Sequence, residues 1–391
     1  SAASDVYKRQ INNIMKVRSL LFSMLCMLAL SVSLTSCSDD DDNSLNDDGS
    51  KVTLPQTARV YILNEGTSGQ NNAGIEFYAP NKDAEIISDI FYKQNAARLG
   101  DTGQDMIKYQ DNIYVSIYGS NYIAKLNAAC VEQNRMTFSD DKDLAAGIRY
   151  MAAENGYIYA SFYGGVIAKI NANTLEVEKK ITGLGNNLEG VTICNNKLYV
   201  ANSYKIVDTK YIYLTDVFII DLDSFSLKET LTVTQNPDQL VEEDDKVFLI
   251  SMDYSDESHV LQLIDPANNN KVSKLGYATD MAAGDDILYL VDSRTDYSNF
   301  PETTTTVNTF SSYNIKTGTM NTNSFLKDAP SELESTSIYM MRVNPNNGDI
   351  YIATTFYSTS NGNIYRFKKD GTFIEKFDCG GQNPKAAVFF N

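Results

Sequence analysis

The stretch IYVSIYGSNYIAKLN at residues 113–127 is followed by a close copy, IYASFYGGVIAKIN, at residues 158–171. In both copies apolar and polar residues alternate, Tyr, Val and Ile are abundant, and a polar or Gly-bearing turn divides the stretch, which is typical of an antiparallel hairpin. Sequences that repeat at intervals of about 20 to 50 residues form solenoids, propellers or arrays. The two copies therefore predict a repeat protein built from β-hairpins.

The same signal occurs seven times after residue 56. The first strands of the repeats are VYIL (60–63), IYVS (113–116), IYAS (158–161), LYVA (198–201), VFLI (247–250), LYLV (288–291) and IYIA (350–353). A second strand and an Asn-, Asp- or Gly-rich turn follow each of them. The mean spacing of about 48 residues suits a propeller blade of four strands. Residues 57–391 are therefore predicted to form an all-β, seven-bladed β-propeller, which protects sheet edges by radial repetition.

The two ends of the propeller are predicted to share one blade. No innermost strand precedes the first repeat, whereas the chain ends with an apolar run, NPKAAVFF (383–390), that has no repeat of its own. Pairing of this run with the first repeat would remove exposed sheet edges. We therefore expect the C-terminal strand to close the first blade.

Residues 15–36 are organised as a secretory signal peptide, with a basic start, an apolar run and small residues before a cysteine. The apolar run is too short for a transmembrane helix. Its ending LTSC (34–37) resembles a bacterial lipoprotein box, which predicts that Cys37 is lipidated and that the protein meets the membrane through a lipid anchor only. An ordinary cleaved signal with a chance cysteine is the alternative. Residues 1–14 precede a natural start at Met15 and are interpreted as a cloning or reading-frame extension.

Residues 37–56 form an acidic run, rich in Ser, Asn and Gly, that begins with four aspartates soon after the cysteine. Such a run cannot bury apolar surface, so we expect a disordered tether. It is either a plain solvated spacer or an address, because it resembles the export signal of surface lipoproteins of some Gram-negative gut bacteria. The second interpretation places the protein on the outer membrane, facing the cell exterior.

The amino-acid composition argues against some classes of binding partner. The formal net charge is −17, from 33 Lys and Arg against 50 Asp and Glu, so the protein is a poor candidate for nucleic acid, which requires a basic surface. Three scattered cysteines follow the tether, Cys130, Cys194 and Cys379. They predict buried single thiols rather than a disulfide framework.

Catalytic motifs are scarce. His259 is the only histidine, so neither a His-based zinc site nor a Ser-His-Asp relay can be assembled. No calcium-loop or nucleotide motif occurs, and we expect no enzyme activity, no cofactor and no metal. Carboxylates at the start of the innermost strands could nevertheless converge on the central channel as a paired-acid hydrolase or an oxygen-only calcium site. These acids are Asp105, Glu189, Asp238 and Asp280. Together with Arg149 of the run GIRY (147–150), they are also candidates for binding a ligand.

A tyrosine recurs in the loop between the two strands of six repeats. These residues are Tyr118, Tyr163, Tyr204, Tyr254, Tyr297 and Tyr357. Such loops share one face of a propeller, beside Asn64 and Glu65 of the first repeat. Tyrosine offers a rigid apolar plate and a hydroxyl, which suits a sugar face or a planar ligand. The alternative is that these rings pack between blades.

Several motifs carry a family resemblance: NEG (64–66), LGD (99–101), NPNNGDIYIA (344–353) and the turn IYRFKKDG (364–371). They resemble YncE-like seven-bladed propellers, a group of gut-bacterial surface lipoproteins that includes the cobalamin-binding BtuG type. The resemblance extends over the chain from Pro55 and rests on structural motifs. It implies the propeller fold and a surface lipoprotein that binds a ligand.

Two functions follow as expectations. The first is a surface protein that binds a small nutrient, a glycan or a corrinoid-like molecule, and passes it to an outer-membrane transporter. The second is a module that docks a protein partner without any small ligand. The carboxylate-based hydrolase is a third and weaker alternative.

Overall fold

The computed structural model describes residues 46, 48–55, 57–80, 85–254, 258–299 and 304–391. The predicted extension (1–14), signal peptide (15–36) and lipidation site Cys37 lie outside these residues, as does most of the predicted tether. Within the described residues, no helix is both long and apolar enough to span a membrane.

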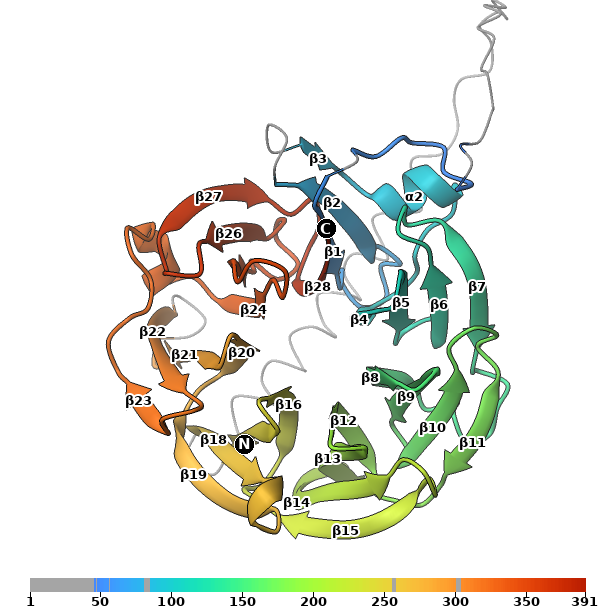
Figure 1. Ribbon diagram of the computed structural model, residues 1–391, viewed down its shortest axis with the longest axis vertical. Helices are drawn as coiled ribbons and strands as arrows, with labels where there is room; N and C mark the ends of the chain where they lie inside the picture. Colours follow the sequence, from blue (N-terminus) through green and yellow to red (C-terminus); the bar gives the residue numbers. More distant parts are fainter. Residues whose placement is uncertain (1–45, 47, 56, 81–84, 255–257, 300–303) are drawn as a thin grey trace, which may run out of the picture. The chain divides into compact units, whose positions relative to one another are not determined.

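Seven four-stranded antiparallel sheets surround a central channel, as Figure 1 shows. From the innermost strand outwards, blade 1 holds β28 (Pro384–Phe390), β1 (Arg59–Asn64), β2 (Gly74–Ala79) and β3 (Glu85–Ile87); blade 2 holds β4 (Gly103–Tyr109), β5 (Asn112–Ile117), β6 (Tyr122–Leu126) and β7 (Glu132–Thr137). Blade 3 holds β8 (Ile148–Glu154), β9 (Tyr157–Phe162), β10 (Val166–Asn171) and β11 (Val177–Ile181); blade 4 holds β12 (Asn187–Cys194), β13 (Lys197–Val207), β14 (Lys210–Asp221) and β15 (Ser226–Thr232).

The remaining blades follow the same order. Blade 5 holds β16 (Pro237–Glu243), β17 (Lys246–Asp253), β18 (Ser258–Asp265) and β19 (Lys271–Tyr277); blade 6 holds β20 (Asp280–Gly284), β21 (Ile287–Asp296), β22 (Thr305–Asn314) and β23 (Thr319–Asn321). Blade 7 holds β24 (Ile338–Val343), β25 (Ile350–Thr354), β26 (Asn363–Phe367) and β27 (Phe373–Asp378). The short helices are α2 (Ile90–Asn95), η1 (Pro266–Asn268) and η2 (Ser331–Glu334). The predicted seven-bladed all-β propeller is confirmed.

The aromatic residue that opens each repeat packs between neighbouring blades. The ring of Tyr114 is buried in a cluster shared by blades 2 and 3, and its hydroxyl donates to the backbone oxygen of Ala172, 2.7 Å away in blade 3. Tyr61 makes the equivalent 2.7 Å bond from blade 1 to Ala128 of blade 2. The repeat in the sequence is therefore a repeated contact of a buried ring between blades, to which the Tyr61 and Tyr114 hydroxyls each add a hydrogen bond.

The C-terminal strand closes blade 1, as predicted. β28 pairs antiparallel with β1, from Arg59 opposite Phe390 to Asn64 opposite Pro384. An ionic network also joins blades 7 and 1, because Arg366 pairs with Asp349 at 2.6 Å and donates to the Tyr78 hydroxyl at 3.1 Å. Both ends of the ring are thus held by backbone pairing and by buried polar contacts.

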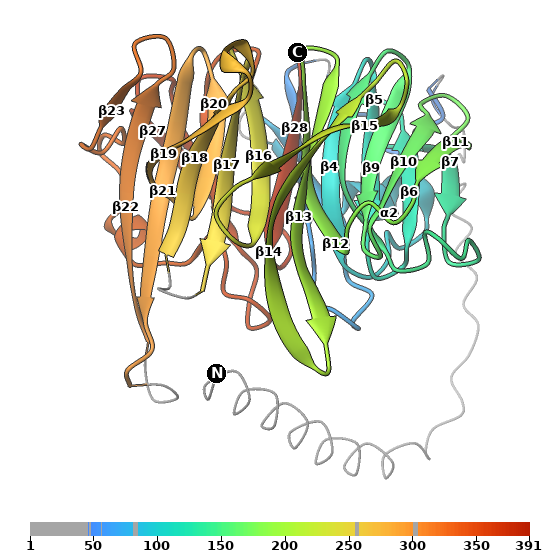
Figure 2. The same cartoon turned by 90° about the horizontal axis from the view of Figure 1, so that it is seen from below.

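Two hairpins are longer than the repeat predicts. In blade 4, β13 and β14 continue past the sheet to a turn at Asp208 and Thr209, and β21 and β22 extend in blade 6. Figure 2 shows both hairpins projecting from the same face. Tyr204, which was expected in a loop, consequently lies within β13. Apart from two lysines, the paired residues beyond it, such as Ile206, Val207 and Tyr211, are β-branched or aromatic, so the strands continue to the turn.

The chain packs against the propeller before the predicted boundary at residue 57. Leu54 is buried, and the side-chain oxygen of Gln94 on α2 accepts hydrogen bonds from the backbone amides of Lys51 and Val52, each at 2.9 Å. The described part of the predicted tether thus belongs partly to the body of the protein. Helix α2 itself lies in blade 1, where no helix was expected.

Candidate functional site

The central channel contains a cavity of about 550 Å³ that is lined by all seven innermost strands. At its mouth, the innermost strand of each blade, or the residue just before it, supplies one side chain at an equivalent position. These residues are Gln104, Arg149, Glu189, Asp238, Thr279, Tyr339 and Lys385. The face of the mouth is the one that carries the turns between the second and third strands of each blade.

Two of the predicted channel acids are engaged in bonds between blades. Asp105 is buried and accepts from the backbone amides of Met106 and Met151, each at 2.9 Å. Asp280 accepts from Met281 at 2.7 Å and from the Gln239 side chain at 2.8 Å. Burial raises the pKa of both carboxyls, although the backbone bonds act in the opposite direction. These two acids join neighbouring innermost strands.

Asp238 differs from the other channel acids. It lines the cavity, and no described residue forms a hydrogen bond or ion pair with it. Burial, and then the nearby charge of Glu189, raise its pKa to about 7. Asp238 is therefore a half-buried carboxyl group that remains accessible from the cavity.

Arg149 and Glu189 form an ion pair at the mouth of the channel. Arg149 Nη2 lies 2.7 Å from Glu189 Oε2, and the Tyr163 hydroxyl donates to the other carboxylate oxygen at 2.5 Å. The guanidinium also lies over the Tyr118 and Tyr163 rings, 5.0 and 4.5 Å from their centroids. Burial acts to lower the pKa of the Arg149 guanidinium, but Glu189 together with the hydroxyls of Tyr163 and Tyr150 raises this pKa above its ordinary value. The predicted candidates Arg149 and Glu189 thus meet with two of the predicted tyrosines.

Four tyrosines continue from this pair as a row of touching rings, which we call the tyrosine arc: Tyr118, Tyr163, Tyr204 and Tyr211. Successive centroids lie 5.5, 6.1 and 5.3 Å apart. The first three rings belong to blades 2, 3 and 4, so they pack between blades and also face the rim. Tyr213 and Tyr254 form a further pair at 5.2 Å between blades 4 and 5.

The other predicted tyrosines are exposed. The exposed fractions are 52% for Tyr254, 62% for Tyr297 and 58% for Tyr357. In blade 1, Asn64 is buried and donates to the Cys379 backbone oxygen at 2.8 Å. Glu65 accepts from Tyr339 and Lys385, both at 2.7 Å. Six predicted tyrosines therefore share one face, whereas Asn64 and Glu65 join blades 7 and 1.

Comparison with known proteins gives the family. Residues 59–390 match the family model described as a domain of unknown function, DUF5074. The chain belongs to the DUF5074 family. No curated protein matches the chain in sequence.

Solved structures resemble this DUF5074 domain in fold. A quinoprotein alcohol dehydrogenase-like protein from Bacteroides thetaiotaomicron superposes with a TM-score of 0.59 at 17% identity, covering 84% of this chain and 77% of that one. The Neurospora crassa Pan2 WD40 domain gives 0.51 at 8% identity, covering 69% and 78%, and a chain of the mitotic checkpoint complex gives 0.51 at 10%, covering 92% and 90%. At these identities the likeness shows the propeller fold alone.

Several channel residues of the DUF5074 domain were not predicted as site residues. Gln104, Tyr150, Gln239, Arg342 and Lys385 all line the cavity. They lie on the innermost strands whose starts were recognised in the sequence, so their position along each strand was the available signal. The prediction considered charged residues on only five of the strands, so it missed the amides and the tyrosine, and it also missed Arg342 on β24 and Lys385 on β28.

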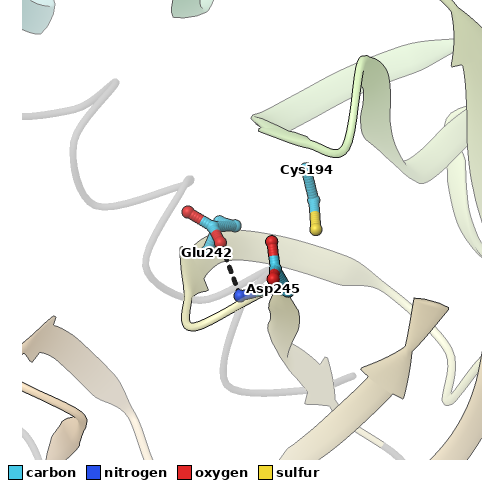
Figure 3. Close-up of side chains that lie close together, drawn as sticks. All are labelled: Cys194, Glu242 and Asp245. Carbon is cyan, nitrogen blue, oxygen red and sulfur yellow. Dashed lines mark hydrogen bonds between the residues drawn. The ribbon is translucent and has the colours of Figure 1, made fainter. Parts of the chain in front are cut away.

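The three cysteines of the described residues are free and buried, as expected. Cys194 lies near Glu242 and Asp245, with one possible ligand atom from each within 4.8 Å of the others, as Figure 3 shows. Burial raises the pKa of the Cys194 thiol to about 12, and metals bind the thiolate. Asp245 is exposed, and its amide donates to Glu242 at 3.1 Å. This group of DUF5074 side chains has the features of an ordinary strand-end turn.

Proposed function

We propose that the protein binds a small ligand on the face that carries the tyrosine arc, and that it does so without catalysis. The observation that carries the proposal is the arc itself, with Arg149 between two of its rings, beside the mouth of a cavity of about 550 Å³. Small-molecule sites are concavities of about 300 to 1,000 Å³ that combine aromatic walls with a few polar groups. The channel cavity has a volume in this range, and the arc supplies aromatic rings next to it without lining it.

The ligand class that suits the arc is a glycan or a planar corrinoid-like nutrient. Flat rings with hydroxyls stack on the apolar face of a sugar or of a macrocycle and donate hydrogen bonds at its edge. The resemblance to YncE-like propellers, which include cobalamin-binding members, supports including corrinoids among the ligands to be tested. The acidic composition supports a neutral or cationic ligand over an anionic one.

The cellular role that we propose is nutrient capture at the outer membrane. Cys37 would hold the propeller by its lipid, and the acidic run behind it would direct the protein to the cell exterior. The protein would then pass its ligand to an outer-membrane transporter.

A thermal-shift screen of glycans, corrinoids and haem tests the proposal. The mature chain from residue 37, with Cys37→Ser to prevent lipidation, is screened beside the double variant Tyr118→Ala/Tyr204→Ala. Each stacked ring contributes roughly 0.5–1.5 kcal/mol beyond its buried area, so the double variant should bind a hit about tenfold more weakly or worse. Tyr277→Ala, which removes an exposed ring from β19 on the outer edge of blade 5, is the control. A destabilised double variant with unchanged affinity would overturn the proposed site.

A second candidate function has support of its own. The long hairpins expose Ile206, Val207 and Ile212 in blade 4 and Val307 in blade 6, with exposed fractions between 41% and 56%. Exposed apolar side chains on one face are typical of protein interfaces. A binding partner lost on Ile206→Ser/Ile212→Ser, with ligand affinity unchanged, would favour a docking module.

A further inference from the structure

We infer that the channel cavity is a binding site for a protonated primary amine, whose ammonium group is held by Asp238. The inference rests on the proposed function, because it names the class of ligand that enters through the same face. The amine site lies in the channel, whereas the proposed stacking site lies on the tyrosine arc. Substitutions in one site can therefore be tested without changing the other.

Four polar groups of the cavity lining lack a partner among the described residues. They are the Asp238 carboxylate, the Tyr150 hydroxyl, the Gln104 Nε2 and the Gln239 Oε1. The strongest case is Gln104, which is only 1% exposed, yet its Nε2 donates to nothing. Buried polar groups are nearly always hydrogen-bonded. Gln104 Nε2 and Gln239 Oε1 are buried atoms of this kind, whereas the Asp238 carboxyl and the Tyr150 hydroxyl are half-buried groups that the cavity leaves accessible. A molecule with both donors and acceptors could therefore bind to all four groups.

The charges of the cavity favour a cation. Its lining carries the carboxyl groups of Asp105, Asp238, Asp280 and Glu242 against the positive charges of Arg342 and Lys385. Lys385 is neutralised by Glu65 at 2.7 Å, which leaves the acids in excess. Placing a positive group near Asp238 would relieve this repulsion, whereas an anion would add to it.

The arrangement of acceptors favours an ammonium group with N–H donors. Asp238 and its sequence neighbour Gln239 offer two acceptors on β16. The rings of Tyr150 and Tyr339 also belong to the lining, but Arg149 and Lys385 already lie over them, each 5.7 Å from the ring centroid, so the site rests on the two acceptors. A quaternary ammonium would leave the Gln239 oxygen without a donor, so a primary amine fits better.

The donors of the cavity lining that have no acceptor indicate which other groups the ligand carries. Gln104 Nε2 requires an acceptor, and the Tyr150 hydroxyl can donate to one as well. A ligand with hydroxyl groups satisfies both, as an amino sugar does, whereas a linear diamine offers only ammonium groups. Both the amino sugar and the diamine carry a protonated amine, but only the amino sugar also carries hydroxyl groups.

Titration calorimetry on the mature chain with Cys37→Ser tests the inference with three probes: glucosamine, N-acetylglucosamine and putrescine. Glucosamine should bind at least tenfold more tightly than its N-acetyl derivative, which is matched in shape near the ring but carries no charge. Asp238→Asn preserves the side-chain size and should weaken glucosamine binding at least tenfold. Asp223→Asn, on the exposed β14–β15 turn, should leave the affinity unchanged.

The outcomes separate the inference from the proposed function. Equal affinity for glucosamine and its acetylated form, or an Asp238→Asn variant that is folded and binds as tightly, would overturn the amine site. A neutral ligand that depends on Tyr118 and Tyr204 but not on Asp238 would also overturn it, while the proposed function would stand. Putrescine binding as tight as that of glucosamine supports the ammonium site and assigns it to diamines. If nothing binds in either experiment, both proposals fail.

Discussion

Arg149 and Glu189 are joined by a 2.7 Å ion pair across the junction of blades 3 and 4, and side-chain exposures of 13% and 5% leave little water around them. Their blades are adjacent, so the pair ties two innermost strands together at the mouth of the channel. The same arginine lies over the Tyr118 and Tyr163 rings. One ionic contact therefore joins two blades and also holds the guanidinium against the tyrosine arc.

Replacing one partner of this pair should cost more than replacing both. Arg149→Met leaves the Glu189 carboxylate buried without its cation, and breaking such a pair costs about 3–5 kcal/mol. The double variant Arg149→Met/Glu189→Gln removes the stranded charge and should recover at least 1 kcal/mol of that loss. Urea unfolding of the two variants measures the difference. A double variant less stable than Arg149→Met would contradict this account of the pair.

The hydroxyl of Tyr114 should contribute to stability apart from its ring. Tyr114→Phe removes the 2.7 Å bond to Ala172 and leaves that buried carbonyl without its donor, which should cost about 1–2 kcal/mol. Tyr114→Ala removes the packed ring as well and should cost about 3–5 kcal/mol. The control is Tyr92→Phe, because that tyrosine is 50% exposed on α2. Thermal unfolding gives the order of the three variants.

Removal of the last strand should open the ring. Deleting residues 385–391 removes nearly all of β28 and exposes the edge of β1, so the truncated chain should aggregate or unfold at a much lower temperature. Light scattering and calorimetry measure both effects. If the truncated chain melts like the full one, blade 1 does not depend on its C-terminal strand.

Asp238 should make the protein less stable as the pH rises. Burial raises its pKa to about 7 from the ordinary value of 3.8, so between about pH 4 and 7 the folded protein binds a proton that the unfolded chain has lost. Stability is thus favoured at low pH, falls through this range and is constant above it. Asp238→Asn removes the penalty and should be about 1–2 kcal/mol more stable than the wild type at pH 8. The difference should disappear near pH 4.

A second acid titrates in the same pH range as Asp238. Burial raises the pKa of Glu76 to about 7, and this residue is present in both proteins, so its contribution cancels in the comparison. A constant difference between wild type and Asp238→Asn across the pH range would show that Asp238 is not the titrating group.

The predicted anchor at Cys37 has a direct test. Labelling cells with a fatty-acid analogue should mark the wild type, and Cys37→Ser should abolish the label. Protease shaving of intact cells should degrade the lipidated protein if it faces the exterior. Labelled protein that survives shaving would retain the anchor and exclude the surface location.

The sequence alone determined the blade count, the strand order and the closure of the ring. Repeated runs such as IYVS and IYAS alternate apolar and polar residues, and this alternation is local information that a strand retains wherever it packs. The apolar run at residues 383–390 had to find an edge, and only the first blade lacked an innermost strand. Periodicity and the cost of an open edge therefore predicted the fold without any tertiary contact.

Only the tertiary structure distinguished the residues of the site from one another. Asp105 and Asp238 are the same residue type near the starts of equivalent strands. Asp105 accepts from the Met151 amide of the next blade, whereas no neighbouring blade offers Asp238 a donor among the described residues. Tyr163 and Tyr357 likewise occupy equivalent turns, yet one meets an ion pair and the other is 58% exposed. A repeat specifies each blade separately, but the partner of a channel side chain comes from the adjacent blade, so its pairing depends on the assembled ring.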